Sequence, residues 1–228
     1  VLQPIGYTDR ETSFEDVINR NVIVSYLQTG AITAPYSIYD GIYKVLPATF
    51  IEITHESNPG VIESPVYYWS LEDVARSGVE NPLSGSDNEL IDGLEDVISK
   101  AVTLQTISDV PLGAYLSGGV DSSLIVGLLQ SNSMEKIKTY TIGFAEKKYD
   151  ESTYAQSVAD HLGTDHTTLY LTKNEMIDSI TDTQNIYDEP LSDSSASLRV
   201  ATLAKQDVKV ALSGDGGDEL FAGYGRVQ

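Results

Sequence analysis

The residues best suited to chemistry lie at positions 117–123, where the chain runs Ser-Gly-Gly-Val-Asp-Ser-Ser. They follow an apolar run ending at Leu116 and precede apolar residues at helical spacing, which predicts a strand, a tight glycine turn and a helix start. Such a turn directs several backbone N–H groups and the positive end of the helix dipole at one point. The stretch therefore predicts an anion site.

The kind of anion is narrowed by what this loop lacks. The chain contains no Gly-Lys pair, which rules out a Walker motif, and no G-x-G-x-x-G fingerprint of dinucleotide-binding domains. Serine hydroxyls and amides suit phosphate oxygens, but the Asp121 carboxylate would repel them unless a divalent cation lay between. We therefore favour phosphate with Mg2+. The alternative is a plain tight turn with Asp121 in the first helical turn for dipole reasons alone.

A second cluster, residues 213–219, has the sequence Ser-Gly-Asp-Gly-Gly-Asp-Glu. Its glycines permit backbone geometry closed to other residues, while Asp215, Asp218 and Glu219 offer oxygen ligands or orienting groups. The alternative is a helix N-terminus with acidic residues in its first turn. That alternative explains one acid well, but three acids among three glycines less well.

The elements that must position these loops alternate between strand and helix signals. Strands are predicted at 112–116, 138–144, 167–171 and 208–212, with helices from 121 and at 151–162, 173–187 and 194–205. Alternation of this kind implies βαβ units and a parallel sheet, in which ligands bind beyond the carboxyl ends of the strands. The turns after Leu116, near Gly143 and after Leu212 all fall at such ends. We predict an α/β fold.

The front part of the chain gives weaker signals. A helix is predicted from Ser13 to a stop at Gly30, and the β-rich runs 49–54 and 61–69 predict a hairpin, too little to close a sheet. Polar residues with interspersed Gly and Pro predict a linker at 73–85. Ser86 and Glu89 then predict a capping box, followed by a helix whose apolar stripe packs on a core.

The composition excludes several classes of function. The 34 acidic residues against 14 basic ones give a net charge of −20, which argues against binding nucleic acid. The absence of Cys excludes disulfides, thiolate metal sites and a cysteine nucleophile. No apolar run approaches the about 18 residues of a spanning helix, so no membrane partner is expected. A reduced cytoplasm fits these features.

Several spaced motifs together resemble the synthetase domain of glutamine-hydrolysing asparagine synthetases. Residues 117–123 resemble the pyrophosphate-binding loop of ATP pyrophosphatases, and the second cluster with residues 220–224 narrows the likeness to that family. Further agreement in order and residue type lies at 111–116, 140–144, 149–152, 188–190 and 193–195. Residues 30–44 resemble the end of the same family's glutaminase domain, so the likeness covers nearly the whole chain.

The resemblance implies an adenine nucleotide α-hydrolase-like parallel sheet with helices on both faces. Before it would stand a β-containing remnant of an N-terminal nucleophile glutaminase domain. The implied organisation is a glutaminase remnant at 1–72, a linker at 73–85 and the first part of the synthetase domain at 86–228. Small molecules, namely ATP, aspartate and ammonia from glutamine, are the expected partners. A homodimer is compatible with the apolar surface expected on the front part.

The implied reaction joins aspartate to AMP and then replaces AMP by ammonia, with ATP and Mg2+ required. By position, Asp121 and Asp218 would hold the metal and pyrophosphate, and Asp215 falls where the family carries an acid tied to forming the adenylate. The family's nucleotide and phosphate contacts fall on Leu116, Ser117, Gly118, Gly119, Asp121, Ser122, Ser123, Ile142, Ser213 and Gly214.

Two departures from the family pattern shape what we expect of this chain. The family's glutaminase uses an N-terminal cysteine, and this chain has none. The family's lysine-bearing segments would lie beyond Gln228. We therefore expect a piece that keeps the ATP-site elements but lacks glutamine hydrolysis and most synthetase turnover.

Two rival functions stay open. One is the same adenylation applied to another carboxylic acid, as in a β-lactam-forming synthetase or an amidotransferase of surface-glycan biosynthesis. The other is a non-catalytic module that binds a nucleotide without turning it over. Acids at both loops count against the second rival, because sensing a nucleotide does not require two metal-holding carboxylates.

Overall fold

The computed structural model of the chain describes residues 17–58, 61, 63–146, 150–184, 186–187, 189–190 and 195–224. The chain divides into two compact units. Unit 1 comprises Val1–Gly85 with Gln184–Asp193, and unit 2 comprises Ser86–Thr183 with Ser194–Gln228. Among the described residues, every helix is too short or too polar to cross a bilayer.

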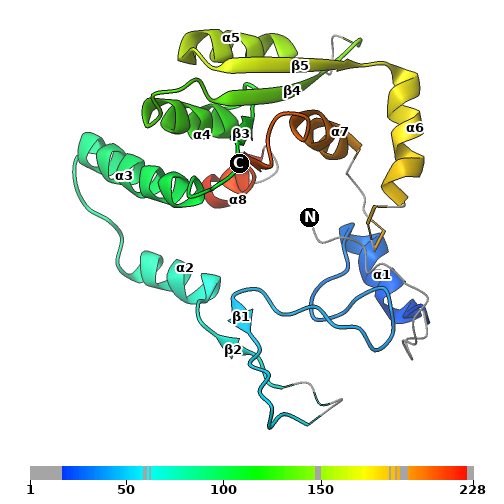
Figure 1. Cartoon of the computed structure of the whole chain (residues 1–228). Coiled ribbons are helices and arrows are strands. Elements are labelled where there is room, and N and C mark those ends of the chain that lie inside the picture. Colours follow the sequence, from blue (N-terminus) through cyan, green and yellow to red (C-terminus); the bar gives the residue numbers. More distant parts are fainter. Residues whose placement is uncertain are drawn as a thin grey trace. The chain divides into compact units, whose positions relative to one another are not determined.

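Unit 2 is built on a four-stranded parallel sheet with the order β5-β4-β3-β6. Figure 1 labels β3, β4 and β5. The strands are β3 (Leu112–Tyr115), β4 (Lys138–Phe144), β5 (Asp165–Leu171) and β6 (Val210–Leu212). The helices are α3 (Asp87–Gln105), α4 (Val120–Ser131), α5 (Ser152–Leu162), α6 (Lys173–Gln184), α7 (Ser195–Ala204) and α8 (Gly217–Phe221). The predicted alternation of strands and helices is confirmed.

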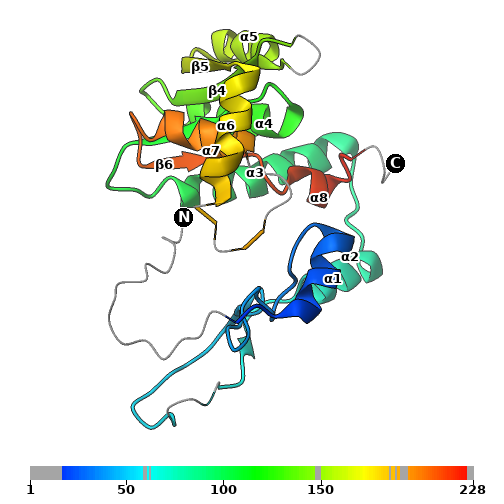
Figure 2. The same ribbon diagram turned by 90° about the vertical axis from the view of Figure 1, so that its right-hand side faces the viewer.

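Helices cover both faces of this sheet, which Figure 2 shows from a second direction. On one face, Ala114 and Leu116 join the buried residues of α3, α4 and α5 in one apolar cluster. On the other face, Tyr140 packs with Leu203 of α7 and with Tyr115. Neighbouring residues of β3 thus point to opposite faces, as the pleat requires. The predicted α/β class with helices on both faces is confirmed.

The strand order creates a switch point between β3 and β6. From β3 the chain moves outward to β4 and β5, and then returns to the opposite side of β3 as β6. In open α/β sheets, the connections that follow two such strands run in opposite directions and leave a crevice between them. Ligands bind in such a crevice, at the carboxyl ends of the strands. The two loops predicted to carry chemistry follow these two strands.

The first helix of unit 2, α3, has the capping box expected from the sequence. Ser86 Oγ accepts from the Glu89 N–H, and the Glu89 carboxylate accepts from the Ser86 N–H at 2.8 Å. The packing prediction holds only for the end of this helix, where Val102 is buried and Ile98 partly buried. The earlier part of the stripe is exposed instead, because only Val102 and Ile98 of this helix join the apolar cluster beside the sheet. The exposed stripe residues are Leu90, Ile91, Leu94 and Val97.

Unit 1 contains α1 (Arg20–Thr29), β1 (Thr49–Phe50), β2 (Val66–Tyr67) and α2 (Leu71–Glu80). Helix α1 ends at Gly30, whose φ of 77° is the left-handed conformation that suits glycine, so the predicted stop is confirmed. The predicted start at Ser13 lies outside the described residues, but the helix was predicted too long: Val17 and Ile18 are not helical, and Asn19 caps a helix that begins at Arg20. The predicted hairpin is confirmed as an antiparallel pair, but with strands of only two residues each.

The predicted linker at 73–85 is helical over most of its length. Ser70 caps α2 by accepting from the Asp73 N–H at 3.2 Å, and acidic residues occupy the first turn. All residues of α2 are exposed, which is why its composition resembles that of a connection. The two units divide after Gly85.

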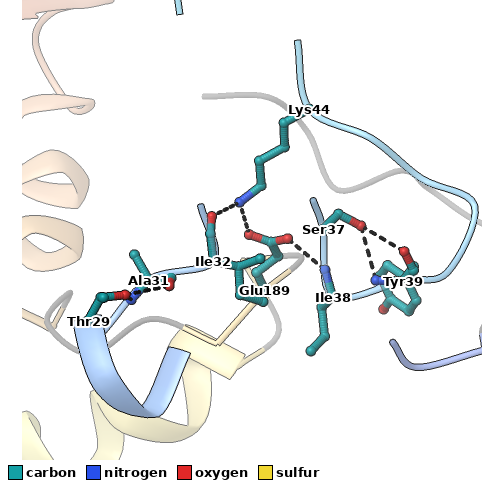
Figure 3. A network of polar contacts seen from close by, with 8 residues as sticks. All are labelled: Thr29, Ala31, Ile32, Ser37, Ile38, Tyr39, Lys44 and Glu189. Carbon is teal, nitrogen blue, oxygen red and sulfur yellow. Dashed lines mark hydrogen bonds and ion pairs between the residues drawn. The ribbon is translucent and has the colours of Figure 1, made fainter. Parts of the chain in front are cut away.

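A short segment after α6 belongs to unit 1, which the sequence did not predict. Glu189 lies against the segment that follows α1 (Figure 3). One oxygen of its carboxylate accepts from the Ile38 N–H at 2.8 Å, and the other pairs with Lys44 Nζ at 2.5 Å. Lys44 also donates to the Ile32 carbonyl at 2.6 Å. We call the contacts of Glu189 and Lys44 with each other and with the backbone of Ile32 and Ile38 the polar clasp. Ile32 and Ile38 are buried with Val22, so the polar clasp lies beside the small core of unit 1.

Candidate functional site

The first loop is folded back on itself by its own serines. Ser117 Oγ and Ser122 Oγ lie 2.9 Å apart, and the Ser122 hydroxyl also accepts from the Ser117 N–H at 3.2 Å. Gly119 is the residue before α4, and this helix has no side-chain cap. An uncapped helix start leaves N–H groups of its first turn available to an outside acceptor. The serines of the loop thus bond to each other, while the helix start that follows has no side-chain cap and can offer N–H groups to a ligand.

The turn depends on Gly118. Its φ is +84°, and a methyl group at this position would lie 2.6 Å from the carbonyl carbon of Tyr154 and from the nitrogen of Ala155. Both atoms belong to the first turn of α5. No other residue type fits here, because the site combines left-handed backbone with no room for a side chain.

The second loop has its own internal brace. Ser213 Oγ donates to Asp215 Oδ2 at 3.0 Å, and Gly216 adopts a φ of 95° just before α8. Asp215 is exposed, whereas Asp218 is partly buried and lies against Gly223. Tyr224 donates to Glu219 at 2.7 Å. Thus the three acids of this cluster have three different surroundings.

The two loops touch each other at the switch point. A methyl group on Gly214 would lie 2.7 Å from the Ser122 nitrogen, and one on Gly217 would lie 2.5 Å from the Asp121 carboxyl carbon. The glycines of the second loop are therefore the surface on which Asp121 and the start of α4 rest. Glycine is needed at both positions for close approach of the two backbones.

One hydroxyl in this region lacks a partner. Ser123 Oγ is buried and makes no hydrogen bond with any group that the structure describes. A buried hydroxyl without a partner costs free energy, about 1–3 kcal/mol. Because Ser123 lies in the first turn of α4, a helix start without a side-chain cap, this hydroxyl is suited to accept from or donate to a ligand.

The Asp215 carboxylate affects the pKa of Tyr115 on the neighbouring strand β3. The pKa of Tyr115 is raised, chiefly because burial disfavours the phenolate and secondly because the Asp215 carboxylate repels it. Tyr115 is the last residue of β3, so this repulsion places Asp215 near the edge of the sheet where the first loop begins. Asp215 therefore lies where an acid could meet a ligand held by both loops.

The donors suit Mg2+ shared with phosphate better than a metal held by protein alone. Among the described residues, no three His, Cys, Asp or Glu side chains gather into a group that could hold a metal ion. Mg2+ commonly uses one or two carboxylates and completes its shell with phosphate oxygens and water. Asp121, beside the serines of its loop, fits that role. The pairing of Asp121 with Asp218 stays a prediction.

Leu116 directly follows β3, and Ile142 lies in β4. Leu116 is 1% exposed, and its N–H donates to the Tyr140 carbonyl at 3.0 Å, so only its backbone could meet a ligand. Ile142 is partly buried in β4, the strand next to β3. Their roles in binding a nucleotide also stay predictions.

The structure adds residues that the sequence reasoning did not assign to the site. Asp150, Ser152 and Tyr170 surround the start of α5, the turn that packs against Gly118. The Asp-x-Ser spacing before a helical segment is a capping signal that could have pointed to the first two. The partnership with Tyr170 depends on the neighbouring strand and has no local signal.

Comparison with known proteins identifies the family. A family model described as asparagine synthase matches residues 93–228, more than half of the chain. The chain belongs to the asparagine synthase family. The matched region contains both loops and the parallel sheet.

Curated relatives of this asparagine synthase family chain are longer than the chain itself. A Methanocaldococcus jannaschii protein, provisionally named glutamine-hydrolysing asparagine synthetase 2, is 35% identical over 218 residues, which cover 94% of this chain and 40% of the relative. The Bacillus subtilis glutamine-hydrolysing asparagine synthetase 1 is 35% identical over 145 residues, covering 63% of this chain and 23% of the relative. The chain thus spans less than half the length of these relatives.

A third relative has a different name. The amidase chry2 of Gibberella zeae is 29% identical over 205 residues, covering 82% of this chain and 30% of its own length.

Among solved structures, the NH3-dependent NAD synthetase of Campylobacter jejuni is similar with a TM-score of 0.43 at 17% identity, covering 62% of each chain. The NMN synthetase of Francisella tularensis has a TM-score of 0.41 at 17% identity, covering 62% of this chain and 59% of its own.

Proposed function

We propose that this chain supplies the ATP site of a glutamine-dependent ligase that amidates aspartate to asparagine. Membership of the asparagine synthase family and two relatives named for that activity support the proposal. ATP, Mg2+, aspartate and ammonia released from glutamine are the proposed reactants of the complete protein. The chain itself is proposed to contribute ATP and pyrophosphate binding.

The proposed reaction has two steps. A β-carboxylate oxygen of aspartate attacks the α-phosphorus of ATP, and the bond from that phosphorus to the bridging oxygen breaks, releasing pyrophosphate. Ammonia then attacks the acyl carbon of β-aspartyl-AMP, AMP leaves with the bonding pair, and the nitrogen loses a proton. Mg2+ would neutralise the charge that collects on the phosphates during the first step.

The residues of the chain act by holding and orienting these groups. Amides of the first loop and the hydroxyls of Ser117, Ser122 and Ser123 would bind the pyrophosphate oxygens, while Asp121 would hold the metal. Asp215 would orient the groups that form the adenylate. Many family members carry Glu at this position, and the Asp215 side chain is shorter by one methylene, so its carboxylate extends less far from the backbone.

The observation that carries the proposal is the contact between the two loops. Gly217 and Gly214 leave no space between the second loop and Asp121 with Ser122. The acid and the amides that would separate AMP from pyrophosphate are thus fixed against each other before any ligand binds. Positioning of this kind is most of what a protein contributes to phosphoryl and nucleotidyl transfer.

The test is isotope exchange between pyrophosphate and ATP in the complete protein, with aspartate present or omitted. We expect exchange that depends on aspartate and Mg2+, and AMP rather than ADP as the nucleotide product. ADP formation would contradict attack at the α-phosphorus. Failure to release pyrophosphate with any acid would instead support the non-catalytic module.

A second acceptor is the specific rival, because a relative named amidase covers most of this chain. Both loops bind parts of ATP common to every such reaction, so they do not discriminate between acids. The same exchange assay run with a panel of carboxylic acids decides between the two. Faster exchange with an acid other than aspartate would replace aspartate as the substrate.

A further inference from the structure

The wall behind the first loop is the start of α5. Gly118 stands in the left-handed conformation, and no side chain fits between it and the backbone of Tyr154 and Ala155. A backbone in such close contact moves with its neighbour, because packed interiors transmit small displacements. The position of the phosphate-facing amides therefore depends on where α5 begins.

Asp150 ties the start of α5 to the end of β4. Its Oδ1 accepts from the Phe144 N–H at 3.2 Å and from the Ser152 N–H at 3.1 Å. Glu151, the residue directly before the helix, makes no side-chain cap, so Asp150 provides the cap from one position earlier. Its hydrogen bonds with Ser152 and with the Phe144 N–H lower the pKa of the Asp150 carboxyl. The carboxylate is the form that this arrangement holds.

Tyr170 of β5 also holds this helix start. Ser152 is 1% exposed, and its hydroxyl donates to the Tyr170 hydroxyl at 3.3 Å. The Tyr170 ring lies over Gly143, where a methyl group would come within 2.6 Å of two ring carbons. The first turn of α5 is thus held by contacts to β4 and β5 on one side and presses on the loop after β3 on the other.

We propose that Asp150 and Tyr170 are positioning residues for the pyrophosphate loop. They fix the first turn of α5, and that turn fixes Gly118 and the amides that follow it. This role rests on the proposed ATP site and adds to it two residues in neither of the loops. Their effect on the nucleotide is transmitted through the helix start.

The experiment compares nucleotide affinity with thermal stability in the complete protein. Affinity for the Mg2+ complex of α,β-methylene ATP is measured by calorimetric titration, and the unfolding temperature by scanning calorimetry. The variants are Asp150→Ala, Asp150→Asn and Tyr170→Phe. Thr172→Ala is the matched control, since Thr172 Oγ1 accepts from the Glu175 N–H at the start of α6 and so also caps a helix of unit 2.

We expect Asp150→Ala to weaken affinity about tenfold, corresponding to about 1.4 kcal/mol. Asp150→Asn should recover most of this affinity, because its amide oxygen can still accept both N–H bonds. Tyr170→Phe keeps the ring over Gly143 and should weaken affinity by a smaller factor. Thr172→Ala should lower the unfolding temperature without changing affinity.

The outcomes separate three cases. Unchanged affinity in folded Asp150→Ala and Tyr170→Phe would overturn the positioning role and leave the ATP site standing. An equal loss of affinity in Thr172→Ala would also overturn it, because the effect would then follow from lower stability alone. Failure of the unsubstituted protein to bind the analogue would overturn the proposed ATP site and with it this role.

Discussion

Replacing Glu189 by alanine should open unit 1 locally around Ile38. The carboxylate satisfies the Ile38 N–H at 2.8 Å and the Lys44 ammonium at 2.5 Å, and the side chains of Glu189 and Lys44 are only 23% and 35% exposed. Since the Ile38 side chain is 8% exposed, water has little access to replace the lost acceptor. Among the residues that the structure describes, the same substitution also leaves the Lys44 ammonium with the Ile32 carbonyl as its one remaining partner.

The magnitude follows from these two losses. A buried N–H left without an acceptor costs about 1–3 kcal/mol, and a partly exposed ion pair contributes about 0.5–1 kcal/mol. We expect Glu189→Ala to lower the local opening free energy by about 2–3 kcal/mol, which accelerates amide exchange about 30- to 150-fold. Glu189→Gln keeps an oxygen for Ile38 and loses only the charge, so about fivefold is expected.

The assay is native-state hydrogen exchange followed by mass spectrometry on peptides that include Ile38. The control is Glu72→Gln in α2, which removes the charge from an exposed pair with Arg76 in the same unit, where the side chains are 80% and 62% exposed. This control should leave exchange at Ile38 unchanged. Exchange in Glu189→Ala within twofold of the unsubstituted protein would refute the reasoning. Equal acceleration of amide exchange in Glu189→Gln and Glu189→Ala would show that the ion pair with Lys44, rather than the hydrogen bond from the Ile38 N–H, stabilises the polar clasp.

Three further predictions concern unit 2. Gly217→Ala should abolish adenylate formation in the exchange assay, because its methyl would lie 2.5 Å from the Asp121 carboxyl carbon, and full activity would contradict this contact. Gly93→Ala in α3 meets no atom within 4 Å and should raise the free energy of unfolding, measured from melting curves, by up to about 1 kcal/mol. Burial lowers the pKa of His166, which bonds Thr139 through Nδ1 at 2.9 Å. The fold favours the neutral ring, so its stability contribution is present above the unfolded pKa of about 6.5 and is lost as pH falls below it. Melting temperatures between pH 7.5 and 5 should fall, and less so in His166→Gln.

Much of unit 2 could be predicted because its signals are local. Strand β4 has the predicted bounds, Lys138–Phe144, since a short run of β-branched, aromatic and apolar residues specifies a buried strand. Gly163 ends α5 with a φ of 74°, as expected for a glycine after a helical stretch. Ser86 and Glu89 form their capping box within four residues.

The failures concern contacts between distant residues. Helix α3 carries a regular apolar stripe, yet its first half is exposed, because periodicity shows which face is apolar and not whether another element covers it. Helix α2 was missed because all of its residues are exposed and no apolar stripe faces a core. The place of Glu189 beside Ile38 involves a separation of 151 residues, for which the sequence has no local signal.

The sequence by itself determined the chemistry that this chain can offer. Hydroxyls, glycines and acids at 117–123 and 213–219, each after a strand, predict two anion- and metal-binding turns, because turn geometry and helix starts depend on neighbouring residues. Only the tertiary structure decided that the two turns lie against each other. Strand β6 pairs with β3 on the side opposite β4, which presses Gly217 against Asp121, and α5 is braced from β4 and β5 so that it presses on Gly118. Strand order and helix packing depend on long-range burial, which no short stretch of sequence specifies.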